Sequence, residues 1–137
     1  MPEMEFKASL QQLGNVLGFV DEQLEICGCP VKTAMQIDVA VEEIFVNIAS
    51  YSYPDSEGKM LLSFDSRDGT AVIRFSDSGI EFNPLAKDDP DVTLSAQERQ
   101  IGGLGIYMVK KSMDDISYKY EDGRNILTIS KKLRETE

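Results

Sequence analysis

The sequence predicts an α+β fold, a two-layer sandwich in which three helices cover one face of a mostly antiparallel sheet of about five strands. Apolar residues repeat at helical spacing in two early segments, whereas four later segments alternate as strands do. Asp-Gly pairs, which are typical of tight hairpins, join successive strand-like segments. The chain has 137 residues, 42% of them hydrophobic and 28% charged, so one globular domain over residues 1–137 is expected.

The first elements are a strand and a helix. Residues 3–8 form a short strand, and Ser9 followed by Gln12 has the spacing of a capping box that opens a helix. Gly28 and Pro30 are expected to end this helix. Its apolar stripe advances by three and four residues and comprises Leu10, Leu13, Leu17, Val20, Leu24 and Cys27.

A second helix and a hairpin follow. The helix is predicted over residues 31–52, with Pro54 just beyond its end. Residues 59–66 and 70–77 alternate as strands, and the pair at 68–69 (Asp-Gly) predicts a hairpin between them. The buried stripe of the helix comprises Ile37, Val41, Ile44 and Ile48.

The last part of the chain begins with residues 78–102, which show no regular pattern. A segment of this length without regular structure is usually functional, often a lid. Residues 103–113 form a short helix, and strands are predicted over 116–120 and 126–132 with an Asp-Gly turn at 122–123. The residues of the short helix that face inward are Ile106, Val109 and Met113.

Charge and composition exclude several classes of function. The 24 acidic and 14 basic residues give a net charge of −10, which argues against nucleic acid and anionic membrane as partners. The absence of histidine excludes Ser-His-Asp triads and zinc sites that need histidine. No stretch approaches the roughly 20 apolar residues of a membrane span, no secretory signal is evident, and Cys27 and Cys29 are expected to be reduced. The expected compartment is the cytosol.

The surplus of acid is concentrated in the first half of the chain. Residues 1–68 hold 12 acidic and 4 basic side chains, whereas residues 69–137 hold 12 acidic and 10 basic ones. The first half is therefore expected to present an acidic surface to a basic protein partner.

Three local motifs could carry chemistry. Glu43 and Asn47 lie four residues apart on one side of the second helix, where an amide oxygen can bind Mg²⁺ and a carboxylate can accept a proton. The alternative is a solvated helix face, and the neighbouring Glu42 lacks such an amide partner. Asp77 and Gly79 end a strand, where a carboxylate can accept an amino hydrogen of adenine, although the motif in isolation favours an Asp-Ser-Gly turn.

The third motif is the glycine-rich segment 101–106, Ile-Gly-Gly-Leu-Gly-Ile, at the start of the short helix. Exposed backbone N–H groups and the positive end of a helix together bind anions. A flexible connector is the other interpretation.

The order of these motifs resembles the GHKL ATPase superfamily, and within it the anti-sigma-factor serine kinases of bacterial partner-switching systems. Residues 41–47 (VEEIFVN) are similar to the N box of that family. Residues 77–84 (DSGIEFNP) resemble its first glycine box, and residues 102–106 (GGLGI) resemble its second. The resemblance covers nearly the whole chain and implies ATP and Mg²⁺ as ligands, with an ATP lid over about residues 80–102.

The resemblance also implies roles for individual residues. Asn47 would coordinate Mg²⁺, Glu43 would act as the catalytic general base, and Asp77 would bind the adenine amino group with Gly79 packed near the base. The second glycine box would wrap the phosphates through Gly103, Leu104 and Gly105, with Gly102 as a hinge. The expected cofactor-binding residues also include Gly102 and Ile106.

Two functions of different class follow from the resemblance. The first is a Mg-ATP-dependent serine kinase, usually a homodimer, that phosphorylates a small antagonist protein and sequesters a sigma factor. The second is a nucleotide-gated binding module without phosphoryl transfer, and a histidine-kinase catalytic domain is a remoter third possibility. Tyr51 stands where many members carry histidine, and the last glycine box is represented only by candidates, 123–125 and Thr128.

Overall fold

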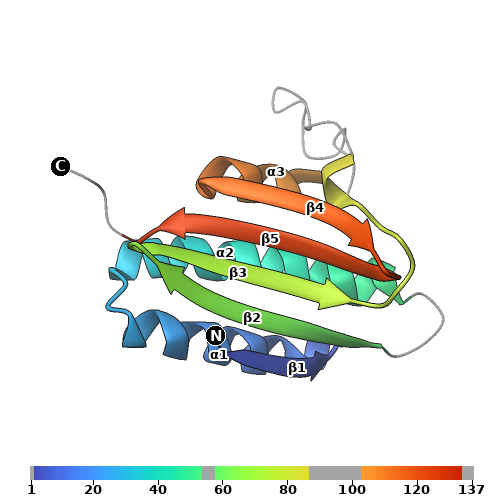
Figure 1. The fold of residues 1–137 in the computed structure, drawn as a ribbon, viewed down its shortest axis with the longest axis horizontal. Coiled ribbons are helices and arrows are strands. Elements are labelled where there is room, and N and C mark those ends of the chain that lie inside the picture. The colour runs from blue at the N-terminus through green and yellow to red at the C-terminus, as the bar shows by residue number, and fades with distance from the viewer. Residues whose placement is uncertain (1, 54–57, 87–102, 134–137) are drawn as a thin grey trace.

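The fold is one antiparallel sheet with three helices on one of its faces, as the sequence predicts (Figure 1). The computed structural model describes residues 2–53, 58–86 and 103–133. The strands lie in the order β1-β2-β3-β5-β4, and every neighbouring pair is antiparallel. The elements are β1 (Glu3–Lys7), α1 (Leu13–Ile26), α2 (Val31–Asn47), β2 (Lys59–Arg67), β3 (Thr70–Asp77), α3 (Gly103–Ser112), β4 (Asp115–Glu121) and β5 (Arg124–Lys132).

Both predicted hairpins are present, and both are closed by two residues with positive φ. Asp68 and Gly69 have φ of 51° and 76°, and Asp122 and Gly123 have φ of 54° and 76°. Two successive left-handed residues make the turn whose twist matches that of antiparallel strands. These turns fix the pairing of β2 with β3 and of β4 with β5.

The core lies between the sheet and the helices. On β3 and β5 the buried side chains alternate, and the register pairs Ile73 with Ile129 and Phe75 with Leu127. The next pair of residues on the same face of β3 and β5 is polar, because Asp77 lies opposite Asn125. The apolar face of the sheet therefore ends in two buried polar side chains at one end of the central strands.

The predicted stripe of α1 is wrong at its first position. Leu10 is 57% exposed, and the fully buried positions of the helix are Val16, Val20 and Leu24. Ser9 caps a 3₁₀ turn, η1 (Leu10–Gln12), before α1 begins. A 3₁₀ turn has three residues per turn instead of 3.6, so it rotates Leu10 away from the line of the following α-helix.

The predicted second helix is an α-helix followed by a π-helical turn. α2 ends at Asn47 and η2 (Ile48–Ser52) continues it. π-Helical turns occur frequently at functional sites, and this one leads to the end of β3. The predicted stop at Pro54 and most of the predicted lid, residues 87–102, lie outside the described residues, while residues 84–86 form a 3₁₀ turn, η3 (Pro84–Ala86). Within the described ranges no helix has the length and apolar character of a membrane span.

Candidate nucleotide site

A pocket lies where the polar end of the sheet meets α2 and η2. It holds about 300 Å³ of empty space, part of it open to solvent. Its walls are mainly apolar, and two of the predicted site residues, Asn47 and Asp77, line it together. The apolar side chains that form its walls include Ile44, Ile48, Phe75 and Leu127.

Asp77 is fixed at the inner end of this pocket. Its side chain is 1% exposed, and Oδ1 accepts hydrogen bonds from the backbone N–H of Gly79 (2.9 Å) and from Nδ2 of Asn125 (3.0 Å). No donor in the described part of the chain reaches the second oxygen, Oδ2. A buried carboxylate held by one oxygen can accept a hydrogen bond from a ligand amino group with the other.

Asn125 organises the site, and its role was not predicted from the sequence. It is 5% exposed, and its Nδ2 also donates to the carbonyl oxygen of Ile80 (2.8 Å). Its Oδ1 accepts from the N–H of Phe82 (3.0 Å) and from the Tyr118 hydroxyl (2.5 Å). The segment 123–125, which includes Asn125, is one of the two candidates that the sequence offers for the last glycine box. Thr128 is the other, but it is three residues further along the strand and so points to the opposite face of the sheet.

Tyr118 is held in its protonated form. Burial raises its pKa, and the negative charge of Glu81 is the next largest cause of that shift. The hydroxyl therefore remains a hydrogen-bond donor to Asn125 at neutral pH. This donor fixes the orientation of the Asn125 amide, and through it the position of Asp77.

Gly79 allows the segment after β3 to pack directly on η2. A Cβ built at Gly79 would overlap the backbone carbonyl oxygen of Ser52. In the space left free, the N–H of Ile80 donates a hydrogen bond to that carbonyl (2.9 Å). The glycine is thus required for the close approach of two backbones at the pocket wall.

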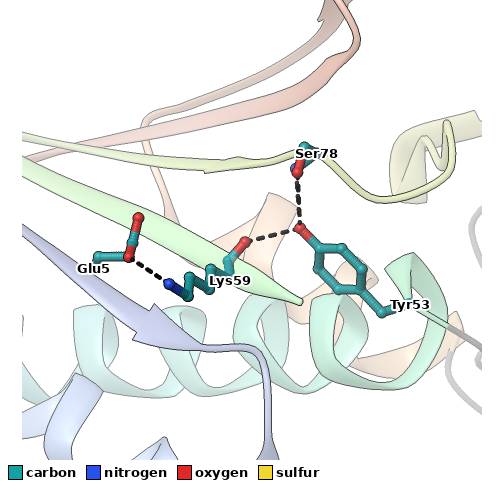
Figure 2. A network of polar contacts seen from close by, with 4 residues as sticks. All are labelled: Glu5, Tyr53, Lys59 and Ser78. Carbon is teal, nitrogen blue, oxygen red and sulfur yellow. Dashed lines mark hydrogen bonds and ion pairs between the residues drawn. The ribbon is translucent and has the colours of Figure 1, made fainter. Parts of the chain in front are cut away.

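The Tyr53 hydroxyl links the end of η2 to the start of β2 and to the segment that follows β3. Its hydroxyl donates to the carbonyl of Lys59 (2.8 Å) and accepts from the N–H of Ser78 (3.0 Å). Figure 2 shows the ring reaching from the end of η2 toward Ser78, while Lys59 forms an ion pair with Glu5 (3.5 Å). A Cβ at Gly58 would overlap the ring, so glycine is needed there as well. No pattern in the sequence had singled out Tyr53.

Glu43 and Asn47 lie on α2 between the pocket and α3. Nδ2 of Asn47 donates to the carbonyl oxygen of Glu43 (2.7 Å), which leaves its Oδ1 without a donor among the described residues. Asn47 lines the pocket and is 9% exposed, so this oxygen is available to a ligand bound in the pocket. A single amide oxygen suits Mg²⁺, which commonly takes its other ligands from phosphates and water.

Glu43 reaches the first turn of α3. A Cβ built at Gly105 would overlap Oε2 of Glu43, so the carboxylate occupies the space that the glycine leaves. α3 begins at Gly103, which places Gly103, Leu104 and Gly105 in its first turn, while Ile106 is buried. Gly102 lies outside the described residues. The predicted carboxylate and the predicted glycine box therefore meet at the positive end of a helix.

Tyr51, Glu42 and the two cysteines are the other residues that the sequence singles out. Tyr51 stacks on Phe82, a pocket-lining residue, with ring centroids 5.2 Å apart and planes inclined by 29°. Glu42 is half-buried and not fully exposed. Cys27 and Cys29 are both thiols and not part of a disulfide, as expected.

Solved structures with the same fold include a protein with RsbU and RsbW domains and the catalytic domain of a histidine kinase. The chain matches the structure of the RsbU and RsbW domains of a Mycobacterium tuberculosis protein with a TM-score of 0.67 and 16% identity, over 97% of this chain and 33% of that one. The chain thus spans about a third of that mycobacterial chain. It also matches the catalytic domain of the histidine kinase ThkA, with a TM-score of 0.55 and 12% identity over 97% and 98% of the two chains. These similarities confirm the fold.

Sequence comparison gives the same relationship. The chain is 23% identical over 125 residues to Serine-protein kinase RsbW of Bacillus cereus (strain AH820), covering 88% of this chain and 72% of the relative. RsbW of Bacillus mycoides (strain KBAB4) matches with the same identity and coverage. The family model described as Histidine kinase-like ATPase domain matches residues 6–131. The motifs, the fold and this match together show that the chain belongs to the family of histidine kinase-like ATPase domains.

Proposed function

We propose that this protein is a Mg-ATP-dependent protein serine kinase that phosphorylates a small antagonist protein and, in a competing complex, sequesters a sigma factor. The family is one of ATPase domains, and the RsbW relatives carry the name of serine-protein kinases. The observation that carries the proposal is the position of Glu43, whose carboxylate lies against the first turn of α3 one helical turn from Asn47. A protein that only binds nucleotide has no need of a base at that place.

The pocket accounts for recognition of the adenine base. Oδ2 of Asp77 accepts the amino hydrogen, and the apolar walls contact the ring faces. Gly79 keeps the pocket wall thin by allowing the backbone of residues 79–80 to pack on Ser52. Asn125 and Tyr118 hold Asp77 in the orientation that this contact requires.

The other end of the site accounts for phosphates and metal. The first turn of α3, with Gly103, Leu104 and Gly105, presents backbone N–H groups to phosphate oxygens, and Gly102 and Ile106 flank this turn in the sequence. Asn47 would hold Mg²⁺ through Oδ1, and the ion, when bound, neutralises charge on the phosphates. Glu43 accepts the proton of the attacking serine hydroxyl.

Label transfer from ATP tests this function. The protein is incubated with γ-labelled ATP, Mg²⁺ and a candidate antagonist protein, and label on that protein is measured. Glu43→Gln should lower transfer at least about a hundredfold, the usual effect of removing a general base, while nucleotide affinity is retained. Glu42→Gln is the matched control, because Glu42 is its sequence neighbour and lacks an amide four residues away. Asn47→Ala should weaken binding of Mg-ATP itself.

The outcomes separate the kinase from a binding module. If no label reaches any antagonist while complexes still form in an ATP-dependent way, the protein is a nucleotide-gated regulator and the kinase proposal is wrong. Equal loss of transfer in the Glu42 and Glu43 variants would remove Glu43 from its assigned role. Wild-type Mg-ATP affinity in Asn47→Ala would contradict the metal assignment.

A further inference from the structure

Helix α2 carries a second apolar stripe on the side that faces away from the core. Val31, Met35 and Val39 follow one another at intervals of four residues, and they are 77%, 64% and 52% exposed. Residues at this spacing lie along one side of a helix. The core stripe of the same helix is on the other side, so α2 is apolar on two sides. A helix that is apolar on two sides usually has a partner on each.

A further exposed apolar side chain lies at the end of the neighbouring helix. Ile26, the last residue of α1, is 74% exposed and is separated from Val31 only by the turn at residues 27–30. α1 and α2 lie side by side on the same face of the sheet (Figure 1). Clusters of large, exposed apolar side chains often mark interaction surfaces, whereas single exposed apolar side chains are common.

The two helices on either side of the turn at residues 27–30 are acidic. Residues 13–52, which span α1, α2 and η2, contain six acidic side chains and one basic side chain, Lys32. Two of the acidic residues, Asp21 on α1 and Asp38 on α2, bring their carboxyl groups together between the helices. The acidic side chains in this range are Asp21, Glu22, Glu25, Asp38, Glu42 and Glu43.

Within residues 2–53, 58–86 and 103–133, no Lys or Arg forms an ion pair with Asp21 or Asp38. Oδ1 of Asp38 is buried and accepts no hydrogen bond from any residue that the structure describes. Burial raises the pKa of Asp38 to about 7, and the hydrogen bond and the charge of Asp21 contribute to the same shift. Two carboxyl groups in contact are therefore costly to ionise together, and a cationic group placed beside them would remove that cost.

We propose that the stripe Val31–Met35–Val39 docks a basic amphipathic helix of a partner protein, whose apolar side covers the stripe and one of whose Lys or Arg side chains pairs with Asp21 and Asp38. The proposal does not rest on kinase activity. A second copy of this chain fits the surface less well, because a two-fold interface would set the acidic residues of these helices against themselves. If the protein is a homodimer, its interface lies elsewhere.

A synthetic helix tests the proposal. The probe is an 18-residue peptide with leucines on one side and lysines on the other, and the control peptide replaces every lysine with glutamate. Binding is followed by amide chemical shifts and by calorimetry at two salt concentrations. The lysine peptide should perturb residues 31–39 and bind more weakly at high salt, whereas the glutamate peptide should not bind.

Matched variants decide whether the stripe is the site. Met35→Ser should weaken binding about tenfold, as expected for a central apolar contact, whereas Met108→Ser, at a methionine of α3 that is 50% exposed, should leave it unchanged. Asp38→Asn should lower affinity severalfold while raising the stability of the free protein, a combination that loss of folding cannot produce.

Other outcomes overturn the proposal. If the lysine peptide does not bind, or binds the Met35 and Met108 variants equally, the stripe is not its docking surface. If sedimentation shows a dimer that Met35→Ser dissociates, the occupant is a second copy and the charge argument is wrong. If Asp38→Asn binds as tightly as the wild type, no cation of the partner pairs with the two carboxyl groups.

Discussion

Replacing Asn125 with alanine should damage both the fold and the nucleotide site. The substitution removes four hydrogen bonds, to Asp77, Ile80, Phe82 and Tyr118. Each is worth roughly 1 kcal/mol net, and water entering from the pocket can replace some of them, so the expected loss of unfolding free energy is about 3 kcal/mol. Urea denaturation measures this loss from the shift of the midpoint at constant slope.

Asn83→Ala is the matched control for this experiment. Asn83 is exposed, and its Oδ1 accepts a local hydrogen bond from the N–H of Leu85 (2.9 Å), so its replacement should cost less than about 1 kcal/mol. Asn125→Ala should also lower ATP affinity about tenfold in calorimetry, because Asp77 loses one of the two donors that orient it. Equal stability of the two variants would refute the network. A loss of stability at unchanged ATP affinity would show that Asn125 supports the fold alone.

Two further substitutions test the buried polar groups and the close backbone contact. Burial raises the pKa of Asp38 from 3.8 to about 7, so the wild type should lose stability relative to Asp38→Asn as the pH rises from about 4 through 7. Because Asp38 is only half-buried, the difference at pH 8 should be about 1–2 kcal/mol, measured by urea denaturation at several pH values. Gly79→Ala should cost more than about 2 kcal/mol and abolish ATP binding, because its methyl group would meet a backbone carbonyl that cannot move aside. Gly14→Ala, whose Cβ would meet nothing within 4 Å, should instead stabilise the protein by about 0.5–1 kcal/mol, and an equal effect of the two substitutions would contradict the packing argument.

Local signals were sufficient to predict most of the elements. The Asp-Gly pairs at 68–69 and 122–123 determine their turns through their own backbone preferences, so the strands on either side could be placed without tertiary information. The stripe of α2 was predictable for the same reason, since its spacing is a property of one helix. Leu10 was misplaced because a serine such as Ser9 can cap either a 3₁₀ turn or an α-helix, and the two differ in hydrogen-bond pattern and in residues per turn.

The polar network of the site could not be predicted from local signals. Asp77 lies opposite Asn125, yet these residues belong to β3 and β5, which no hairpin connects. Their pairing requires β5 to lie between β3 and β4, and this strand order is a property of the whole sheet. The contacts of Tyr53 could not be predicted for the same reason, because its partners Lys59 and Ser78 come together only after β2 and β3 have paired. The motif residues were found because each motif is continuous in the sequence.

Helix α2 carries one residue of an acidic pair and part of the proposed nucleotide site at different points along its length. Its end at Asn47 presents a neutral amide to the pocket. The Asp21–Asp38 pair lies nearer the start of the helix, because Asp38 precedes Asn47 by nine residues. At 1.5 Å per residue this separation is about 14 Å, which exceeds the Debye length of about 8 Å at physiological salt. The acidic pair therefore repels an anionic nucleotide only weakly, although the chain as a whole carries a charge of −10. The proposed docking surface for a basic partner and the proposed nucleotide site can share one helix because they lie at different places along it.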